Sequence, residues 1–211
     1  MPDQQEIQAA SVSPKVQHIW CSVGITKKME DVLIGFMLGQ IRGGENISEY
    51  IFYLSTSGGN PFSAINLYNF MQTIPQQTTV YNMGSVASAG VTFFLGFKTR
   101  IGVPDCSFMV HQTSIPRGVL PENVTVSDLE TQRNSLWDTD QKTQKIILKE
   151  TASHGTKNLT KAGIKKDFLN STIYHSDDAV QYGFIDRIET PTMPETGMFF
   201  LTDQFLATLA G

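Results

Sequence analysis

Hydrophobic positions in the first half of the chain follow two patterns that alternate along the sequence. Ile51–Leu54 is apolar at every position, which is typical of a parallel strand buried on both faces. Pro61–Thr73 instead carries an apolar stripe at the spacing of one helix face, formed by Ala64, Leu67, Tyr68 and Met71 and continued by Ile74. The first pattern predicts a strand, and the second predicts an amphipathic helix packed on a sheet.

The same two patterns recur on either side of this pair. They predict strands at Val16–Val23, Thr78–Tyr81 and Phe108–Gln112, and helices at Asp31–Arg42 and Val91–Phe97. Strands that are separated by helices indicate β-α-β units joined by right-handed crossovers. The expected fold class is therefore α/β, built on a largely parallel sheet.

The second half is more polar. Ser127-Asp128-Leu129-Glu130 has the spacing of a capping box and predicts a long, sparsely apolar helix over Ser127–Ala152. Ser176–Gly183 is expected to form a short helix with Ser176 as its cap, and Phe184–Ile188 a strand. The apolar run Met198–Leu201 in the tail predicts docking on the chain's own body or on a neighbour. Residues 1–14 lack periodicity and are expected to form a flexible arm.

Length, charge and composition exclude several classes of protein. A chain of 211 residues suits one domain, and a net charge of −4 gives no basic surface for nucleic acid. No apolar run is long enough to span a membrane, and the N-terminus lacks the pattern of a secretion signal. The two cysteines, Cys21 and Cys106, lack C-x-x-C spacing. We therefore expect a cytoplasmic protein with reduced core cysteines, no bound metal and no cofactor.

Three features with residue types that are used in catalysis follow predicted strands. Gly58-Gly59 comes after Ile51–Leu54, Ser88 lies among small residues after Thr78–Tyr81, and His111 lies in the third alternating run. A serine becomes a nucleophile when a base takes its proton and backbone N–H groups stabilise the oxyanion that forms. Each feature alone is more typical of packing or of a turn. Their order along the chain favours a serine hydrolase, although Ser88 lacks the G-x-S-x-G pattern of the α/β-hydrolases.

These residues resemble the proteolytic subunit of the Clp protease. The chain reads SGG, MGSVASAG, LGFKTRIGVPDCSFMVHQ and DDAVQYGFID, where the family reads approximately SPGG, MGQAASMG, LPNS-x-x-MIHQP and PEAVEYGLVD. The resemblance covers Val16 to Ile188. It implies a crotonase-like spiral of β-α-β units over residues 15–190, with a protruding strand-helix handle at about 113–155 and a separate tail at 191–211.

By that resemblance Ser88 is the nucleophile, His111 is the base, and the N–H groups of Gly59 and Ala89 form the oxyanion hole. An ungapped alignment puts Ser171 where the family carries its triad aspartate, so Ser171, Asn170 and Asp167 all remain open as the third member. The family's partners imply a homo-oligomeric ring, two stacked heptamers, an AAA+ ATPase unfoldase and unfolded polypeptide as substrate. Pro116 and Pro121 depart from the family's glycine-rich handle strand.

The resemblance therefore predicts an ATP-dependent serine endopeptidase subunit that cuts peptides or unfolded proteins inside an oligomeric chamber. One alternative is a weak or inactive partner subunit, because the triad lacks its aspartate in the simplest alignment. The other is a crotonase-type acyl-CoA enzyme, which would use the same two N–H groups to hold a thioester enolate. It has no obvious acidic pair near the Gly-Gly turn.

Overall fold

The computed structural model describes residues 14–115 and 123–209. In these residues the domain is built around one eight-stranded sheet. Its main path runs β6-β5-β3-β2-β1-β8, with β4 pairing β3 and β7 at one side. The strands are β1 (Lys15–Ser22), β2 (Ile47–Thr56), β3 (Gln77–Ala87), β4 (Thr99–Gly102), β5 (Ser107–Met109), β6 (Ile173–His175), β7 (Arg187–Ile188) and β8 (Met198–Thr202). All pairings are parallel except that of β5 with β6.

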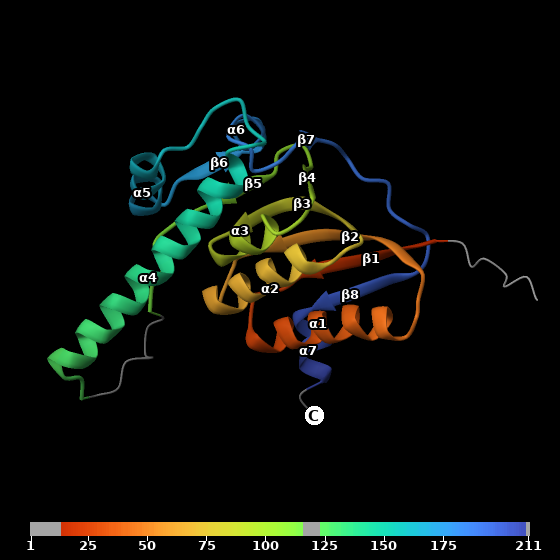
Figure 1. The fold of residues 1–211 in the computed structure, drawn as a ribbon, viewed down its shortest axis with the longest axis horizontal. Helices are drawn as coiled ribbons and strands as arrows, with labels where there is room; N and C mark the ends of the chain where they lie inside the picture. Colours follow the sequence, from red (N-terminus) through yellow and green to blue (C-terminus); the bar gives the residue numbers. More distant parts are fainter. Residues whose placement is uncertain (1–13, 116–122, 210–211) are drawn as a thin grey trace, which may run out of the picture.

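The helices lie mainly over one face of this sheet, and α4 projects away from the body (Figure 1). They are α1 (Lys27–Arg42), α2 (Pro61–Thr73), α3 (Ala89–Phe94), α4 (Val126–Thr151), α5 (Lys161–Asn170), α6 (Ser176–Gln181) and α7 (Asp203–Thr208). The chain alternates strand and helix from β1 to α3, which confirms the predicted β-α-β units.

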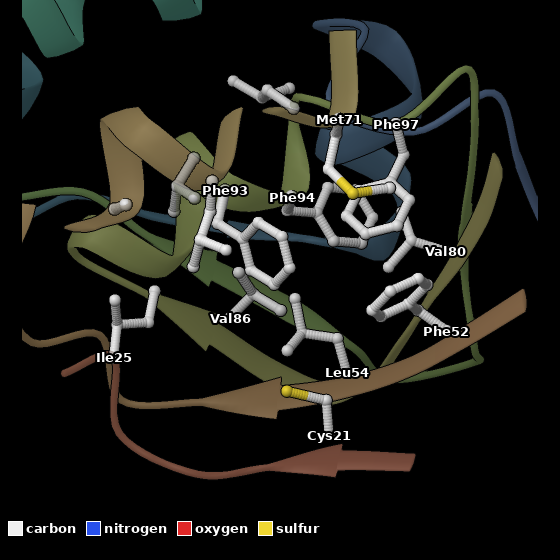
Figure 2. Packing of buried hydrophobic residues seen from close by; sticks show 14 of the residues in the cluster. Cys21, Ile25, Phe52, Leu54, Met71, Val80, Val86, Phe93, Phe94 and Phe97 are labelled. Atoms are coloured by element: carbon white, nitrogen blue, oxygen red, sulfur yellow. The ribbon is translucent and has the colours of Figure 1, made fainter. Parts of the chain in front are cut away.

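The main core lies between the sheet and helices α2 and α3 (Figure 2). Phe52 and Leu54 of β2 point into it, and Phe52 meets Phe97 edge to face with ring centroids 4.8 Å apart. Tyr53, between them, points to the other face of the sheet and stacks on Tyr81. The uniformly apolar run that predicted a strand buried on both faces is therefore packed on both faces.

Several element boundaries differ from the sequence prediction. Helix α1 starts at Lys27 because the Thr26 hydroxyl accepts the Met29 N–H, 3.1 Å away. Helix α4 is capped by Thr125 rather than Ser127, since Thr125 and Asp128 bond reciprocally as a capping box. His175 rather than Ser176 is the N-cap of α6. Strand β7 covers only the end of the predicted strand at 184–188.

The C-terminal segment joins the body of the domain. Strand β8 pairs with β1 in parallel register, and Phe199 stacks on Phe36 of α1 with ring centroids 4.0 Å apart. This confirms docking of the apolar tail on the chain's own body. The arm at 1–13 and the prolines Pro116 and Pro121 lie outside the described residues.

Both cysteines are free and buried in the core. Burial raises the pKa of Cys21 to about 12 and that of Cys106 to about 11, so both thiols stay protonated at neutral pH. The two side chains therefore act as small core residues, as the sequence predicted.

Candidate active site

Ser88 lies at the junction between β3 and α3, with φ 56° and ψ −130°. A positive φ is uncommon for a residue other than glycine, and such conformations concentrate at functional sites. The surroundings hold it there, because its N–H donates to the Met109 carbonyl at 2.7 Å and Val86 and Phe93 on either side are buried in the core (Figure 2). The Ser88 side chain is partly exposed and is thus available for chemistry.

The Gly-Gly turn after β2 approaches Ser88 so closely that only glycine fits. A Cβ on Gly58, where φ is +93°, would lie 2.7 Å from the Ser88 Cβ and 2.7 Å from the Ala87 carbonyl oxygen. On the opposite side the turn is fixed by Ile25, whose N–H donates to the Gly58 carbonyl and whose carbonyl accepts the Asn60 N–H, each at 2.8 Å.

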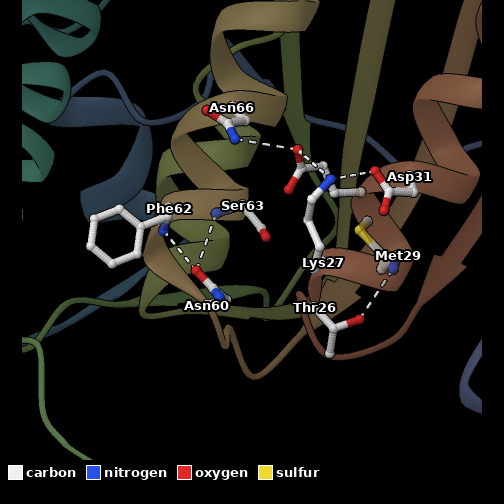
Figure 3. A network of polar contacts seen from close by, with 9 residues as sticks. Thr26, Lys27, Met29, Asp31, Asn60, Phe62, Ser63 and Asn66 are labelled. Atoms are coloured by element: carbon white, nitrogen blue, oxygen red, sulfur yellow. Dashed lines mark hydrogen bonds and ion pairs between the residues drawn. The ribbon is translucent and has the colours of Figure 1, made fainter.

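The starts of α1 and α2, which are capped by Thr26 and Asn60, flank this turn (Figure 3). The Asn60 side chain accepts the N–H groups of Phe62 and Ser63 and thereby caps α2 directly after the glycine pair. The buried Glu30 of α1 accepts a hydrogen bond from Asn66 of α2 at 3.2 Å, which joins the two helices one turn further on. The backbone next to Ser88 is therefore held from both sides.

Two backbone N–H groups at this junction are free to bind a ligand. The Gly58 N–H donates to the Thr56 hydroxyl at 3.1 Å, but the N–H groups of Gly59 and Ala89 donate to no other described residue. Both residues line the cavity beside Ser88. Free backbone donors beside a serine are the kind of group that stabilises a tetrahedral oxyanion.

His111 lies two residues beyond the end of β5, not within the strand as the alternating pattern predicted. The Val110 N–H still bonds to the Thr172 carbonyl in the register of β5 with β6, and the segment then leaves the sheet, because the Gln112 N–H bonds to the Phe168 carbonyl of α5. His111 lines the same cavity as Ser88. Its imidazole forms no hydrogen bond with Ser88 or with any other residue that the structure describes.

Ser88, His111, Gly59 and Ala89 thus share one cavity of about 80 Å³. Its remaining walls come from the segment around His111, from α4 and from α5. They are formed by Pro61, Val110, Thr113, Ser114, Thr143, Ile147 and Phe168. The structure therefore brings together Ser88, His111, Gly59 and Ala89, the four residues that the sequence singled out.

The family model for Clp protease matches residues 3–192, nearly the whole chain. The chain belongs to the Clp protease family. It is 28% identical over 139 residues to the ATP-dependent Clp protease proteolytic subunit 1 of Streptomyces avermitilis, a match covering 64% of this chain and 58% of that protein. It is 26% identical over 142 residues to subunit 3 of Rhodococcus jostii, covering 66% of this chain and 65% of that protein.

The fold agrees with this membership. A substituted form of ClpP1 from Listeria monocytogenes superimposes with a TM-score of 0.66 at 18% identity, covering 83% of this chain and 91% of that one. The domain therefore has the ClpP fold of the crotonase-like class, as the sequence indicated. The chain matches less than two thirds of the length of both curated relatives.

The three residues considered for the Clp triad's third position lie in different surroundings. Asp167 is engaged elsewhere, because its carboxylate accepts the hydroxyls of Tyr174 at 2.6 Å and Thr172 at 3.2 Å. Burial and this hydrogen bond raise the pKa of Tyr174, so Tyr174 remains a donor to Asp167. Asn170 and Ser171 are exposed at the end of α5, and Ser171 has a left-handed backbone with φ 53°.

The walls contributed by α4 and α5 were not predicted from the sequence. Asp140 of α4 is buried and accepts the Thr113 N–H at 2.8 Å, which ties the segment after His111 to the helix. Thr143 and Ile147 follow on the same helix, and Phe168 comes from α5. The pattern of α4 places Asp140, Thr143 and Ile147 on one face, but nothing local indicates that this face meets Ser88.

None of the described helices is both long and apolar enough to cross a membrane. Within residues 14–115 and 123–209, no three His, Cys, Asp or Glu side chains are grouped so that they could hold a metal ion.

Proposed function

We propose that this chain is a Clp-type serine endopeptidase subunit, with Ser88 as the nucleophile and His111 as the general base. The observation that carries the proposal is the shared cavity, where a strained, partly exposed serine meets a histidine and two free backbone N–H groups. Ser88 Oγ attacks the scissile carbonyl while His111 takes its proton. Gly59 and Ala89 then stabilise the oxyanion, and His111 returns the proton to the leaving amine.

The third position of the triad belongs to Ser171 in this proposal. Pairing of β5 with β6 joins Met109 to Ile173, and the bond from Val110 to Thr172 extends that register. His111 directly follows Val110 and Ser171 directly precedes Thr172, so both residues lie at the end of this pairing, where the two segments leave the sheet. A neutral serine at that position would orient the imidazole weakly, which favours low activity and supports a weak or inactive partner subunit as the second candidate function.

A fluorophosphonate probe is expected to label the protein at Ser88 alone, because Ser88 combines a base with two oxyanion donors. Mass spectrometry of the digested adduct identifies the labelled residue. Ser88→Ala should abolish labelling, and Ser85→Ala should leave it unchanged, since Ser85 lies exposed on β3 and lines a different cavity. Labelling at Ser85, or none at all, would contradict the proposed chemistry.

The proposed substrates are unfolded polypeptides and peptides, cut inside a ring of identical subunits that works with an AAA+ ATPase. The ATP-dependence is proposed because the names of both related subunits include it. The oligomer has support in the structure, because the buried residues of α4 all lie in its C-terminal half. In the other half Val126, Leu129 and Trp137 are 73%, 52% and 65% exposed. Exposed apolar residues of this size on a projecting helix indicate contact with another copy.

Light scattering is therefore expected to give the mass of a ring, near seven or fourteen chains, at micromolar concentration. Trp137→Glu should lower this mass, because a charge would be buried at the subunit contact. Gln132→Glu adds the same charge on the same half of the helix without removing an apolar contact, and should change the mass less. A wild-type monomer would remove the chamber and leave at most a small-peptide hydrolase.

A further inference from the structure

The segment that carries His111 is held through its backbone. The imidazole has no hydrogen-bond partner among the described residues, and the nearby Asp167 carboxylate is engaged by Tyr174 and Thr172. When no acidic side chain orients an imidazole, its position depends on the backbone on either side of it. The bonds made by residues 110–113 therefore decide where the base lies relative to Ser88.

Three hydrogen bonds anchor this segment. The N–H groups of Val110 and Gln112 donate to backbone carbonyls at 3.0 and 3.2 Å. The Thr113 N–H instead donates to a side chain, the Asp140 carboxylate of α4, at 2.8 Å. A hydrogen bond to an ionised acceptor is about twice as strong as one between neutral groups. The bond to Asp140 is therefore a strong anchor, and of the three it alone depends on a side chain.

The burial of Asp140 fits a role in this contact. Asp140 is only 7% exposed, whereas Asp138, two residues earlier on α4, is exposed and pairs with Lys142. Asp140 forms no ion pair with any residue that the structure describes. A buried carboxylate is costly unless hydrogen bonds satisfy it, and the Thr113 N–H supplies such a bond.

We propose that Asp140 is a positioning residue for His111. By holding the Thr113 N–H, its carboxylate fixes the backbone two residues after the base, and with it the approach of the imidazole to Ser88. Two residues span at most ~7.6 Å of chain, so a shift at Thr113 is passed on to His111. The inference rests on the proposed function, because it concerns the base of that reaction.

Asp140→Ala is expected to slow fluorophosphonate labelling of Ser88 ~10²-fold, the cost of misplacing a reacting group by ~1 Å. For a fluorogenic peptide, kcat should fall by a similar factor while KM stays nearly unchanged, because the base acts in the chemical step. Asp140→Asn should keep at least about a tenth of the wild-type rate, since its amide oxygen can still accept the Thr113 N–H.

Amide hydrogen exchange measures the anchoring bond itself. The Thr113 N–H should lose its protection in Asp140→Ala and keep most of it in Asp140→Asn. Mass spectrometry of the peptide that covers residues 110–115 reads this out in the folded protein, independently of any activity. Loss of protection together with slow labelling would tie the bond to the position of the base.

Two variants of α4 are matched controls and should label Ser88 at the wild-type rate. Asp138→Asn makes the same chemical change at an exposed carboxylate two residues earlier. Thr139→Ala alters the buried residue next to Asp140, whose hydroxyl bonds within the helix to the Ser135 carbonyl.

Asp140→Glu keeps the charge and the acceptor but displaces them by one methylene. Glutamate favours helix, so this variant provides a test even where Asp140→Ala does not fold. It should slow labelling ~10-fold or more, since the anchor would hold Thr113 at a shifted position. Labelling at the wild-type rate would contradict the positioning role.

The outcomes separate the two proposals. If the wild-type protein fails to label at Ser88, the proposed function fails. If the wild type labels and Asp140→Ala labels equally fast while the Thr113 N–H exchanges faster, the positioning role alone is overturned. Equal losses in Asp140→Ala and Asp140→Asn, or a comparable loss in Thr139→Ala, would also overturn it, because the anchoring bond would then not be the cause.

Discussion

Replacing Ser171 with aspartate is expected to raise kcat for peptide hydrolysis by as much as ~10⁴-fold, the loss seen when a triad aspartate is neutralised. Ser171 and His111 each adjoin the last bond between the two segments, from the Val110 N–H to the Thr172 carbonyl. Aspartate also tolerates the left-handed backbone at this position, where φ is 53°.

The matched control is Asn170→Asp. Asn170 is the adjacent residue, it is also exposed, and the substitution adds the same charge, but Asn170 lies within α5, one residue further from the bond between Val110 and Thr172. Initial rates with a fluorogenic peptide and rates of fluorophosphonate labelling should both rise in Ser171→Asp and remain unchanged in Asn170→Asp. A rise in both variants would indicate a general effect of charge. No rise in either, with thermal unfolding unchanged, would mean that the third group comes from elsewhere.

The sequence predicted the sheet and the residues around Ser88 well, because both depend on short segments. Each strand-to-helix unit in the first half has its own hydrophobic period and its own turn residues. Gly58-Gly59, Ser88 and His111 all follow strands, and neighbouring parallel strands present their carboxyl ends at one edge of the sheet. Local patterns were therefore sufficient to bring these residues together.

The remaining parts of the site depend on contacts that no local pattern encodes. The walls of the cavity meet only because α4 and α5 lie beside the segment that follows β5. Sequence distance alone leaves Asp167 open for the triad and does not predict that its carboxylate accepts the hydroxyls of Tyr174 and Thr172. The start of α4 was misplaced because two capping patterns overlap, and the one at Thr125 forms.

Gly58→Ala is expected to lower kcat by at least ~10²- to 10³-fold, the cost of losing one oxyanion donor. The added Cβ would lie 2.7 Å from the Ala87 carbonyl oxygen and from the Ser88 Cβ, so the turn must move away from Ser88. The Gly59 N–H would move with it, because Gly59 is the next residue of the same turn. Steady-state kinetics on a fluorogenic peptide measure the loss.

Gly35→Ala distinguishes this local effect from the general cost of replacing a glycine. Gly35 lies on the exposed side of α1, and a Cβ there would meet nothing within 4 Å. Alanine in a helix interior is ~0.5–1 kcal/mol more favourable than glycine, so Gly35→Ala should raise the unfolding temperature and leave kcat unchanged. If Gly58→Ala kept wild-type kcat, the close approach of the turn to Ser88 would have no role in catalysis. If it lost activity while still folded and still labelled slowly at Ser88, the serine and its base would remain in place, and the defect would lie in the oxyanion donors.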